Sequence, residues 1–259
     1  MSFTKHSLAL AGAFLVAPLV LLAGCTPSAQ PSAAASGRTL TVFAAASLKG
    51  SFTKIADAFA ADHPGTKITY NFDGSSALVD QLKGGASADV FASADEANMK
   101  KAADASLISG TPKIFATNVL TLVVAPGNPK HITGLDSSLA SAKLVVCAHG
   151  VPCGSAFATL EKNLGVTLKP VSEEQKVTDV LGKVISGEAD AGVVYATDAK
   201  GAADKVTTVG IPGADKVINR YPIAATAVSK QADLAAAFID FVASAKGQDV
   251  LASGGFGMA

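Results

Sequence analysis

The chain has 259 residues, with 21 basic and 21 acidic side chains, so its formal net charge is zero at pH 7. It contains no run of basic residues, which argues against a nucleic-acid partner, because proteins that bind nucleic acids usually present clustered Lys and Arg. Hydrophobic residues make up 49% of the chain, enough for one large domain or for two smaller ones.

The first residues resemble a bacterial lipoprotein signal. Lys5 precedes an apolar run at residues 8–22, and the sequence Leu-Ala-Gly-Cys then ends at Cys25. The run is shorter than the roughly 20 apolar residues that a membrane-spanning helix needs, and Pro18 interrupts it. We therefore expect residues 1–24 to be a signal peptide, and Cys25 to carry a lipid that anchors an extracytoplasmic protein to the cell membrane.

Residues 25–37 form the next segment, and most of them are Ser, Ala, Pro, Gln or Gly. Such small and polar residues do not build a core, so the composition predicts a flexible tether. The folded part of the chain is expected to begin near Arg38.

Beyond this point, strand patterns alternate with helix patterns. Residues 39–45 are apolar like a buried strand, residues 48–59 carry apolar side chains at helical spacing, and residues 68–72 alternate like a second strand. A helix at residues 78–82 and a strand at 89–93 follow. Further strands are predicted at residues 119–125, 143–148, 191–195, 205–210 and 222–228, with helices between most of them and a long last helix at 230–245. The alternation predicts an α/β protein with mostly parallel sheets, whose ligand sites lie where strands end and helices begin.

Candidate hydrogen-bond donors stand at several of these strand-to-helix junctions. Ser47 and Ser75 follow the first two strands, Cys153 and Val180 lie where two later helices open, and Tyr195 ends an apolar strand. A helix N-terminus offers unpaired N–H groups and the positive end of the helix dipole, which together suit an anion. Each feature alone is explained as a helix cap or a core aromatic. Their joint placement indicates a cage of uncharged donors.

Two cysteines, Cys147 and Cys153, remain if Cys25 carries lipid. An even pair outside the reducing cytosol favours a disulfide that closes a short loop. His149 lies between them, so a metal or redox site at Cys147, His149 and Cys153 is the alternative. That spacing matches no common zinc pattern, and the disulfide is therefore preferred.

Several segments occur in the order and spacing found in the molybdate-binding protein family (ModA), the substrate-binding component of the molybdate ABC transporter. They are FAAASL, FDGSSALVDQL, ADVFASAD, VPCG, VTDV and GVVYATDA, and the similarity spans most of the folded part. The resemblance implies that the oxyanion is held by the hydroxyls of Ser47, Ser75 and Tyr195 and by the backbone amides of Cys153 and Val180. It implies no catalysis, no cofactor and no ligand to a metal cation.

The resemblance also implies a two-lobed fold of the periplasmic-binding-protein type (type II) with a two-strand hinge. One lobe would comprise residues 38–118 plus 223–259, and the other residues 119–222. The anion would bridge both lobes and favour their closure, and the permease of the importer would recognise the closed form. A monomer is the expected state.

The chemistry of the donors favours molybdate, with tungstate as its analogue. Molybdate is a fully deprotonated dianion that only accepts hydrogen bonds, whereas phosphate usually keeps a proton and needs a carboxylate to accept it. Asp73 is the only candidate carboxylate, and with Gly74 it departs from the family pattern. We expect Asp73 to face solvent or to cap the helix. Sulfate offers the same bonds as molybdate, so a protein for another tetrahedral oxyanion is the alternative.

An enzyme is the other class of protein to consider. A serine hydrolase needs a Ser placed with a His and a carboxylate, but Ser75 lacks the G-x-S-x-G elbow and no motif connects a histidine to it. The sequence therefore favours a binding protein over an enzyme.

Overall fold

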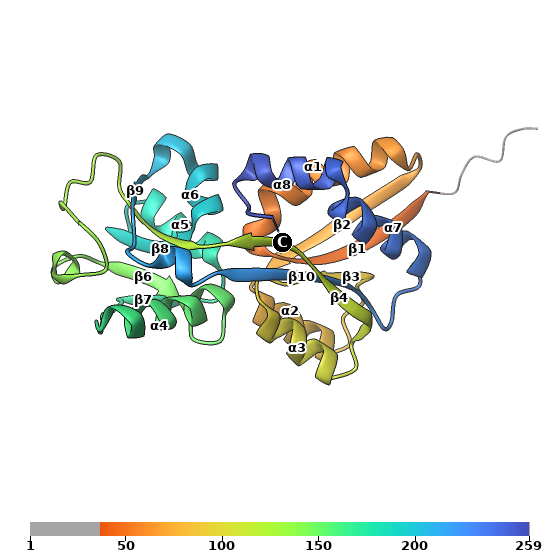
Figure 1. Cartoon of the computed structure of the whole chain (residues 1–259), viewed down its shortest axis with the longest axis horizontal. Helices are drawn as coiled ribbons and strands as arrows, with labels where there is room; N and C mark the ends of the chain where they lie inside the picture. The colour runs from red at the N-terminus through yellow and green to blue at the C-terminus, as the bar shows by residue number, and fades with distance from the viewer. Residues whose placement is uncertain (1–36, 259) are drawn as a thin grey trace, which may run out of the picture. The chain divides into compact units, whose positions relative to one another are not determined.

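A computed structural model of the protein describes residues 37–258. The predicted signal peptide, the predicted lipid-attachment residue Cys25 and nearly all of the predicted tether lie outside these residues. Within the described part there are two five-stranded sheets, each covered by helices (Figure 1). None of the helices in residues 37–258 is long and apolar enough to cross a membrane.

The first sheet has the strand order β2-β1-β3-β10-β4. Its strands are β1 (Arg38–Ala45), β2 (Thr66–Asp73), β3 (Val90–Ala92), β4 (Ile108–Asn118) and β10 (Asn219–Thr226). Strand β1 pairs in parallel with β2 and β3, whereas β10 runs antiparallel between β3 and β4. The carboxyl ends of β1 and β2 therefore lie at the same edge of the sheet, where Ala45 is paired with Asp73.

Helices of the first domain cover both faces of this sheet. They are η1 (Ala46–Leu48), α1 (Lys49–Asp62), α2 (Ser75–Lys83), α3 (Glu96–Asp104), α7 (Ala232–Ala243) and α8 (Ala245–Gly254). Apolar side chains at helical spacing explain how α1 packs on the sheet. Its residues Phe52, Ile55 and Phe59 lie on one face of the helix and are fully buried. The second face is filled by Leu78, Leu82 and their neighbours on α2 and α3.

The second sheet repeats the same plan with the order β7-β6-β8-β5-β9. Its strands are β5 (Leu120–Val124), β6 (Leu144–Cys147), β7 (Ser172–Glu174), β8 (Ala191–Tyr195) and β9 (Thr207–Val209). Its helices are η2 (Ser137–Leu139), α4 (Pro152–Leu164), α5 (Val177–Ile185), α6 (Ala196–Ala202), η3 (Ala203–Lys205) and η4 (Ala214–Lys216). Strand β6 is parallel to β7 and β8, and β5 is antiparallel to β8 and β9.

The predicted α/β class and the two-domain fold are confirmed, with one difference in strand direction. Each sheet is mixed, because two of its four pairings are parallel and two are antiparallel. The antiparallel strands belong to the segments that connect the sheets: β4 leads directly into β5, and β10 returns to the first sheet (Figure 1). Strand β10 pairs with β4 from Asn219 onward, ahead of the predicted boundary at 222/223, and the lobe limits stay a prediction.

Two strands and the last helix were not predicted. Strand β4 contains Gly110 and Pro112 and lacks apolar alternation; it lies at the edge of its sheet, where proline is tolerated. Strand β7 is a three-residue polar edge strand. The predicted last helix at residues 230–245 corresponds to α7, and α8 lies beyond it. Helix α8 begins where the Ser244 side chain accepts a hydrogen bond from the Gly247 N–H.

Candidate ligand-binding site

A small cavity lies between the two sheets at the ends of β1, β2 and β8. Its volume is about 10 Å³, and both domains contribute to its wall. The lining residues are Ala45, Ala46, Ser47, Asp73, Gly74, Ser75, Ala94, Val151, Pro152, Cys153, Val177 and Tyr195. Four of the five residues predicted from the sequence are therefore brought together, from segments far apart along the chain. This volume is far below the several hundred Å³ of sites for drug-sized ligands, which are therefore excluded.

Val180 is the predicted residue that does not line the cavity. Helix α5 begins at Val177, so Val180 is the fourth residue of the helix. Only the N–H groups of the first turn of a helix lack a partner within the helix, and Val180 lies one turn further in. Val177 takes its place in the cavity wall.

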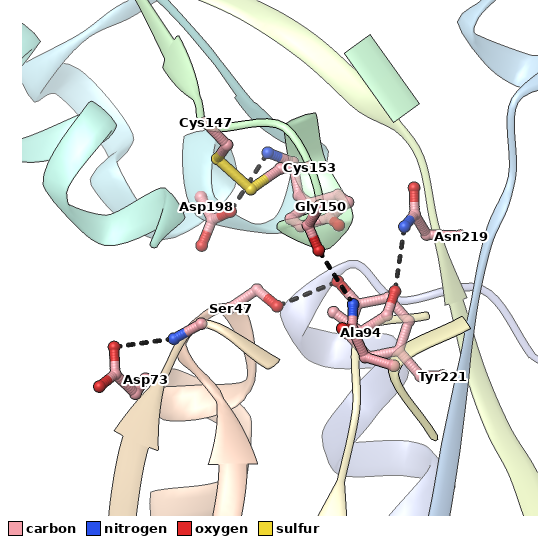
Figure 2. The surroundings of a disulfide bond; sticks show 12 residues. Ser47, Asp73, Ala94, Cys147, Gly150, Cys153, Asp198, Asn219 and Tyr221 are labelled. Atoms are coloured by element: carbon pink, nitrogen blue, oxygen red, sulfur yellow. Dashed lines mark hydrogen bonds between the residues drawn. A yellow bond between two sulfur atoms is a disulfide. The ribbon is translucent and has the colours of Figure 1, made fainter. Parts of the chain in front are cut away.

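Ser47 follows β1 and lies in the short helix η1. The side chain is buried, with 8% of the residue exposed. Its hydroxyl oxygen lies 3.0 Å from the hydroxyl of Tyr221 on β10 (Figure 2). Tyr221 was not among the predicted site residues, and no sequence signal distinguishes it from a core aromatic.

Ser75 is the first residue of α2, and it is also buried. Its hydroxyl oxygen accepts a hydrogen bond from the Ala94 N–H at 3.0 Å. A serine hydroxyl has one proton to donate, so this bond leaves the Ser75 proton available to a ligand.

Tyr195 ends β8 and is almost completely buried. Its hydroxyl has no hydrogen-bond partner among the residues that the structure describes. Burial raises the pKa of this hydroxyl well above its ordinary value, so it stays protonated and remains a donor. Buried polar groups are nearly always paired, and an unpaired hydroxyl at the wall of a cavity therefore indicates a site for an acceptor.

Three helices begin at the cavity without a side-chain cap. Their N-cap residues are Gly74 for α2, Val151 for α4 and Lys176 for α5, and none of these side chains accepts a hydrogen bond from its own helix. Cys153 is in the first turn of α4. The backbone N–H groups at these helix starts and the positive ends of three helix dipoles favour an anion.

The predicted disulfide is present. Cys147 at the end of β6 is bonded to Cys153 in α4, with the two Cα atoms 5.7 Å apart (Figure 2). Both sulfur atoms are used in this bond, so the alternative metal site at Cys147, His149 and Cys153 loses two of its three ligands. Gly154 follows, and a Cβ there would lie 2.1 Å from the Ala148 carbonyl oxygen, so the helix start packs closely on this loop.

Asp73 is engaged at the edge of the cavity. Its Oδ1 atom accepts a hydrogen bond from the Gly74 N–H at 2.9 Å and lies 3.8 Å from the Lys176 ammonium of the second domain. The Oδ2 atom accepts a hydrogen bond from the Gln81 side-chain amide at 3.3 Å, so the carboxylate is engaged by three donors, one of them cationic. The loop at Gly74 also approaches the second domain, because a Cβ on Gly74 would lie 2.1 Å from the Gln175 carbonyl oxygen.

Fold and site together are those of a class, the two-domain α/β binding proteins, with a cavity between the sheets that suits a small anion. A family profile for bacterial extracellular solute-binding proteins matches residues 40–257. The molybdate-binding protein ModA of Mycobacterium tuberculosis is 47% identical over 258 residues, which cover 99% of each chain. The chain therefore belongs to the bacterial extracellular solute-binding protein family and, within it, to the molybdate-binding proteins ModA. This membership makes it a solute-binding protein and not an enzyme.

Solved structures show the same fold. The periplasmic molybdate-binding protein of Azotobacter vinelandii aligns with a TM-score of 0.74 at 21% identity, covering 85% of this chain and 99% of that one. The sulfate-binding protein SubI of Mycobacterium tuberculosis aligns with a TM-score of 0.67, also at 21% identity, covering 85% and 86%. The fold is thus shared by proteins for different oxyanions, and the ligand has to be argued from the site.

Proposed function

We propose that this protein captures molybdate outside the cytoplasm and delivers it to the permease of an ABC importer. The observation that supports this most strongly is the buried Tyr195 hydroxyl, which has no partner in the described part of the chain and stands with two serines at one cavity. The identity of 47% with a molybdate-binding protein over 99% of the chain agrees with this ligand.

The proposed ligands are the hydroxyls of Ser47, Ser75 and Tyr195 and the backbone amides of Cys153 and Val177. Val177 replaces Val180 in this set because it lines the cavity at the start of α5. Each hydrogen bond to an ionic partner contributes about 1.5 to 3 kcal/mol. Several such bonds in one enclosed site support tight binding without a Lys or Arg against the anion.

The character of the donors argues for a fully deprotonated oxyanion. Hydrogen phosphate carries a proton that needs an acceptor, but Asp73, a carboxylate in the cavity wall, is paired with Gly74 and Lys176. Tungstate presents the same charge and oxygen atoms as molybdate and is proposed as a second ligand.

We further propose that the lipid on Cys25 keeps the protein at the cell membrane as a monomer, close to the permease. The sequence Leu-Ala-Gly-Cys at the end of the apolar run supports this anchoring. The tether at residues 25–37 would let the folded part reach the permease.

Calorimetric titration of the purified protein tests the function directly. Molybdate, tungstate, sulfate and hydrogen phosphate are each titrated into the protein, and we expect one molybdate or tungstate per chain. Sulfate is expected to bind at least about 100-fold more weakly, which corresponds to about 2.7 kcal/mol. Equal binding of sulfate and molybdate would contradict the selectivity, and the absence of binding by all four anions would contradict the function.

A further inference from the structure

A chain of buried hydrogen bonds leads from the backbone to the ligand cavity through side chains that do not line it. We propose that Tyr221, oriented by Asn118, is a specificity-determining positioning residue that fixes the Ser47 hydroxyl as a donor toward the ligand. This inference rests on the proposed function, because it concerns how the same cavity selects its anion. The relevant side chains are all buried: Ser47, Asn118, Thr197 and Tyr221.

Asn118, the last residue of β4, determines which group donates and which accepts in these hydrogen bonds. Its Oδ1 atom accepts a hydrogen bond from the Val119 N–H at 3.0 Å, which identifies the other side-chain atom as the amide nitrogen. That nitrogen donates to the Thr197 hydroxyl at 2.8 Å and to the Tyr221 hydroxyl at 3.4 Å. A side-chain amide nitrogen has no acceptor capacity, so the Tyr221 oxygen accepts in this contact.

The Tyr221 proton is then directed to Ser47. The Ser47 oxygen lies 3.0 Å from the Tyr221 oxygen, close enough to accept a hydrogen bond from this hydroxyl. Burial raises the pKa of Tyr221, so the hydroxyl keeps its proton. A buried hydroxyl donor is rarely left unpaired, which favours the direction from Tyr221 to Ser47 over the reverse.

The Ser47 oxygen therefore accepts a hydrogen bond from the Tyr221 hydroxyl, and the Ser47 proton can be donated to a ligand in the cavity. Ser75 is set in the same way, but by the backbone N–H of Ala94. Each hydroxyl oxygen then has one lone pair occupied and directs its own proton to the ligand. Such a site donates to a fully deprotonated oxyanion and offers no strong acceptor to the proton of hydrogen phosphate.

The location of these hydrogen-bonded side chains agrees with a role in positioning the donors to the ligand. Asn118 and Tyr221 lie on β4 and β10, the strands of the segments that connect the two sheets, and Thr197 lies on α6 of the second domain. Tyr221 also packs against the ring of Tyr195, with the ring centroids 5.9 Å apart. The donor from the first domain and the donor from the second are thus held by one buried cluster.

The variant Tyr221→Phe tests this inference, because it keeps the aromatic ring and removes the hydroxyl that donates to Ser47. Molybdate and hydrogen phosphate are titrated into the wild type and the variant by calorimetry at pH 8. We expect molybdate to bind about tenfold more weakly, because the Ser47 hydroxyl is free to rotate away. Hydrogen phosphate is expected to bind equally well or better, because the Ser47 oxygen can now accept its proton. The ratio of the two affinities therefore falls about tenfold or more.

Tyr70→Phe is the matched control, because the Tyr70 hydroxyl donates to the Phe52 carbonyl oxygen at 2.7 Å and Tyr70 does not line the cavity. It is expected to leave the ratio unchanged. An equal loss of both affinities in Tyr221→Phe, or an unchanged ratio, would show a merely structural role and overturn this inference alone. A wild type that binds no oxyanion would reject the proposed function and this inference with it.

Discussion

At the residue level, Tyr195 connects the stability of the fold with the proposed ligand site. Its hydroxyl is buried and has no partner among the described residues, and leaving a buried polar group unpaired costs about 1 to 3 kcal/mol. Stability of the ligand-free protein is thus reduced at the same position where an acceptor would be bound.

The variant Tyr195→Phe should separate these two effects. We expect the free energy of unfolding of the ligand-free protein to rise by about 1 kcal/mol, because an unpaired hydroxyl is removed. Molybdate affinity should fall by about 10- to 100-fold, because one donor to the anion is lost. Urea denaturation and calorimetry measure the two quantities. A variant that loses stability while keeping its affinity would contradict the role of this hydroxyl.

Asp198 in α6 is a second residue whose effect can be measured, as a pH dependence of the free energy of unfolding. Burial raises the pKa of its carboxyl group to about 7, against the opposing effect of the hydrogen bond from the Tyr195 N–H at 3.2 Å. A carboxyl group with a pKa that is higher in the folded state stabilises the fold at low pH. This contribution is complete below pH 3.8, the ordinary pKa, and is lost as the pH rises through about 7.

The free energy of unfolding should therefore fall by up to about 4 kcal/mol between pH 4 and pH 8 through Asp198. In Asp198→Asn this part of the pH dependence should disappear, because the amide does not ionise. Urea denaturation at several pH values, compared between the two proteins, measures the difference. Parallel curves for the wild type and the variant would show that Asp198 does not titrate in this range.

At the scale of elements, the N-termini of α2, α4 and α5 meet at one cavity, and the approach of α2 to the second domain depends on Gly74. The φ angle of Gly74 is −59°, which any residue can adopt. A Cβ there would nevertheless lie 2.1 Å from the Gln175 carbonyl oxygen. The glycine is thus required by the contact between the domains and not by its own backbone.

The variant Gly74→Ala should therefore weaken binding more than folding. We expect molybdate affinity to fall by at least about tenfold, while the ligand-free protein keeps its stability to within about 1 kcal/mol because the domains can stay apart. Gly182→Ala in α5 is the control, since nothing lies within 4 Å of a Cβ at that position. Equal affinities of Gly74→Ala and the wild type would mean that this contact is not needed for binding.

Much of the element order was predictable from the sequence, and the reasons for the exceptions are physical. Strand β8 and the buried face of α1 follow directly from apolar periodicity. Strand β4 was missed because its pairing with β10 decides its structure more than its own residues do. Val177 was missed because the start of α5 carries no side-chain cap, and Asn118 and Tyr221 because only the folded chain brings them to Ser47.

At the scale of the whole molecule, a net charge of zero conceals an uneven distribution. A wider cleft of about 760 Å³ adjoins the cavity at Ser47, and four exposed lysines and only one carboxylate line it. The lysines are Lys49, Lys54, Lys200 and Lys205. None of them forms an ion pair within the described part of the chain. A cleft lined by one sign of charge attracts an oppositely charged ligand and raises its association rate.

Replacing these four lysines by Gln should lower the association rate constant for molybdate by roughly tenfold at low ionic strength and leave the dissociation rate constant nearly unchanged. Stopped-flow measurements at several salt concentrations test this, and the difference should shrink as salt is added. The control replaces four exposed lysines that do not line this cleft: Lys67, Lys83, Lys162 and Lys169. An equal loss of rate in the control would attribute the effect to net charge alone.

In the proposed function, one oxyanion is held between the two domains by uncharged donors from both. The most direct measurement is a crystal structure of the protein with molybdate, in which anomalous scattering locates the molybdenum atom. We predict a single molybdenum site. The oxygen atoms of this molybdate should accept hydrogen bonds from Ser47 and Ser75 of the first domain and from Cys153 and Tyr195 of the second. A molybdenum atom that contacts only one domain, or that lies outside this cavity, would contradict the account.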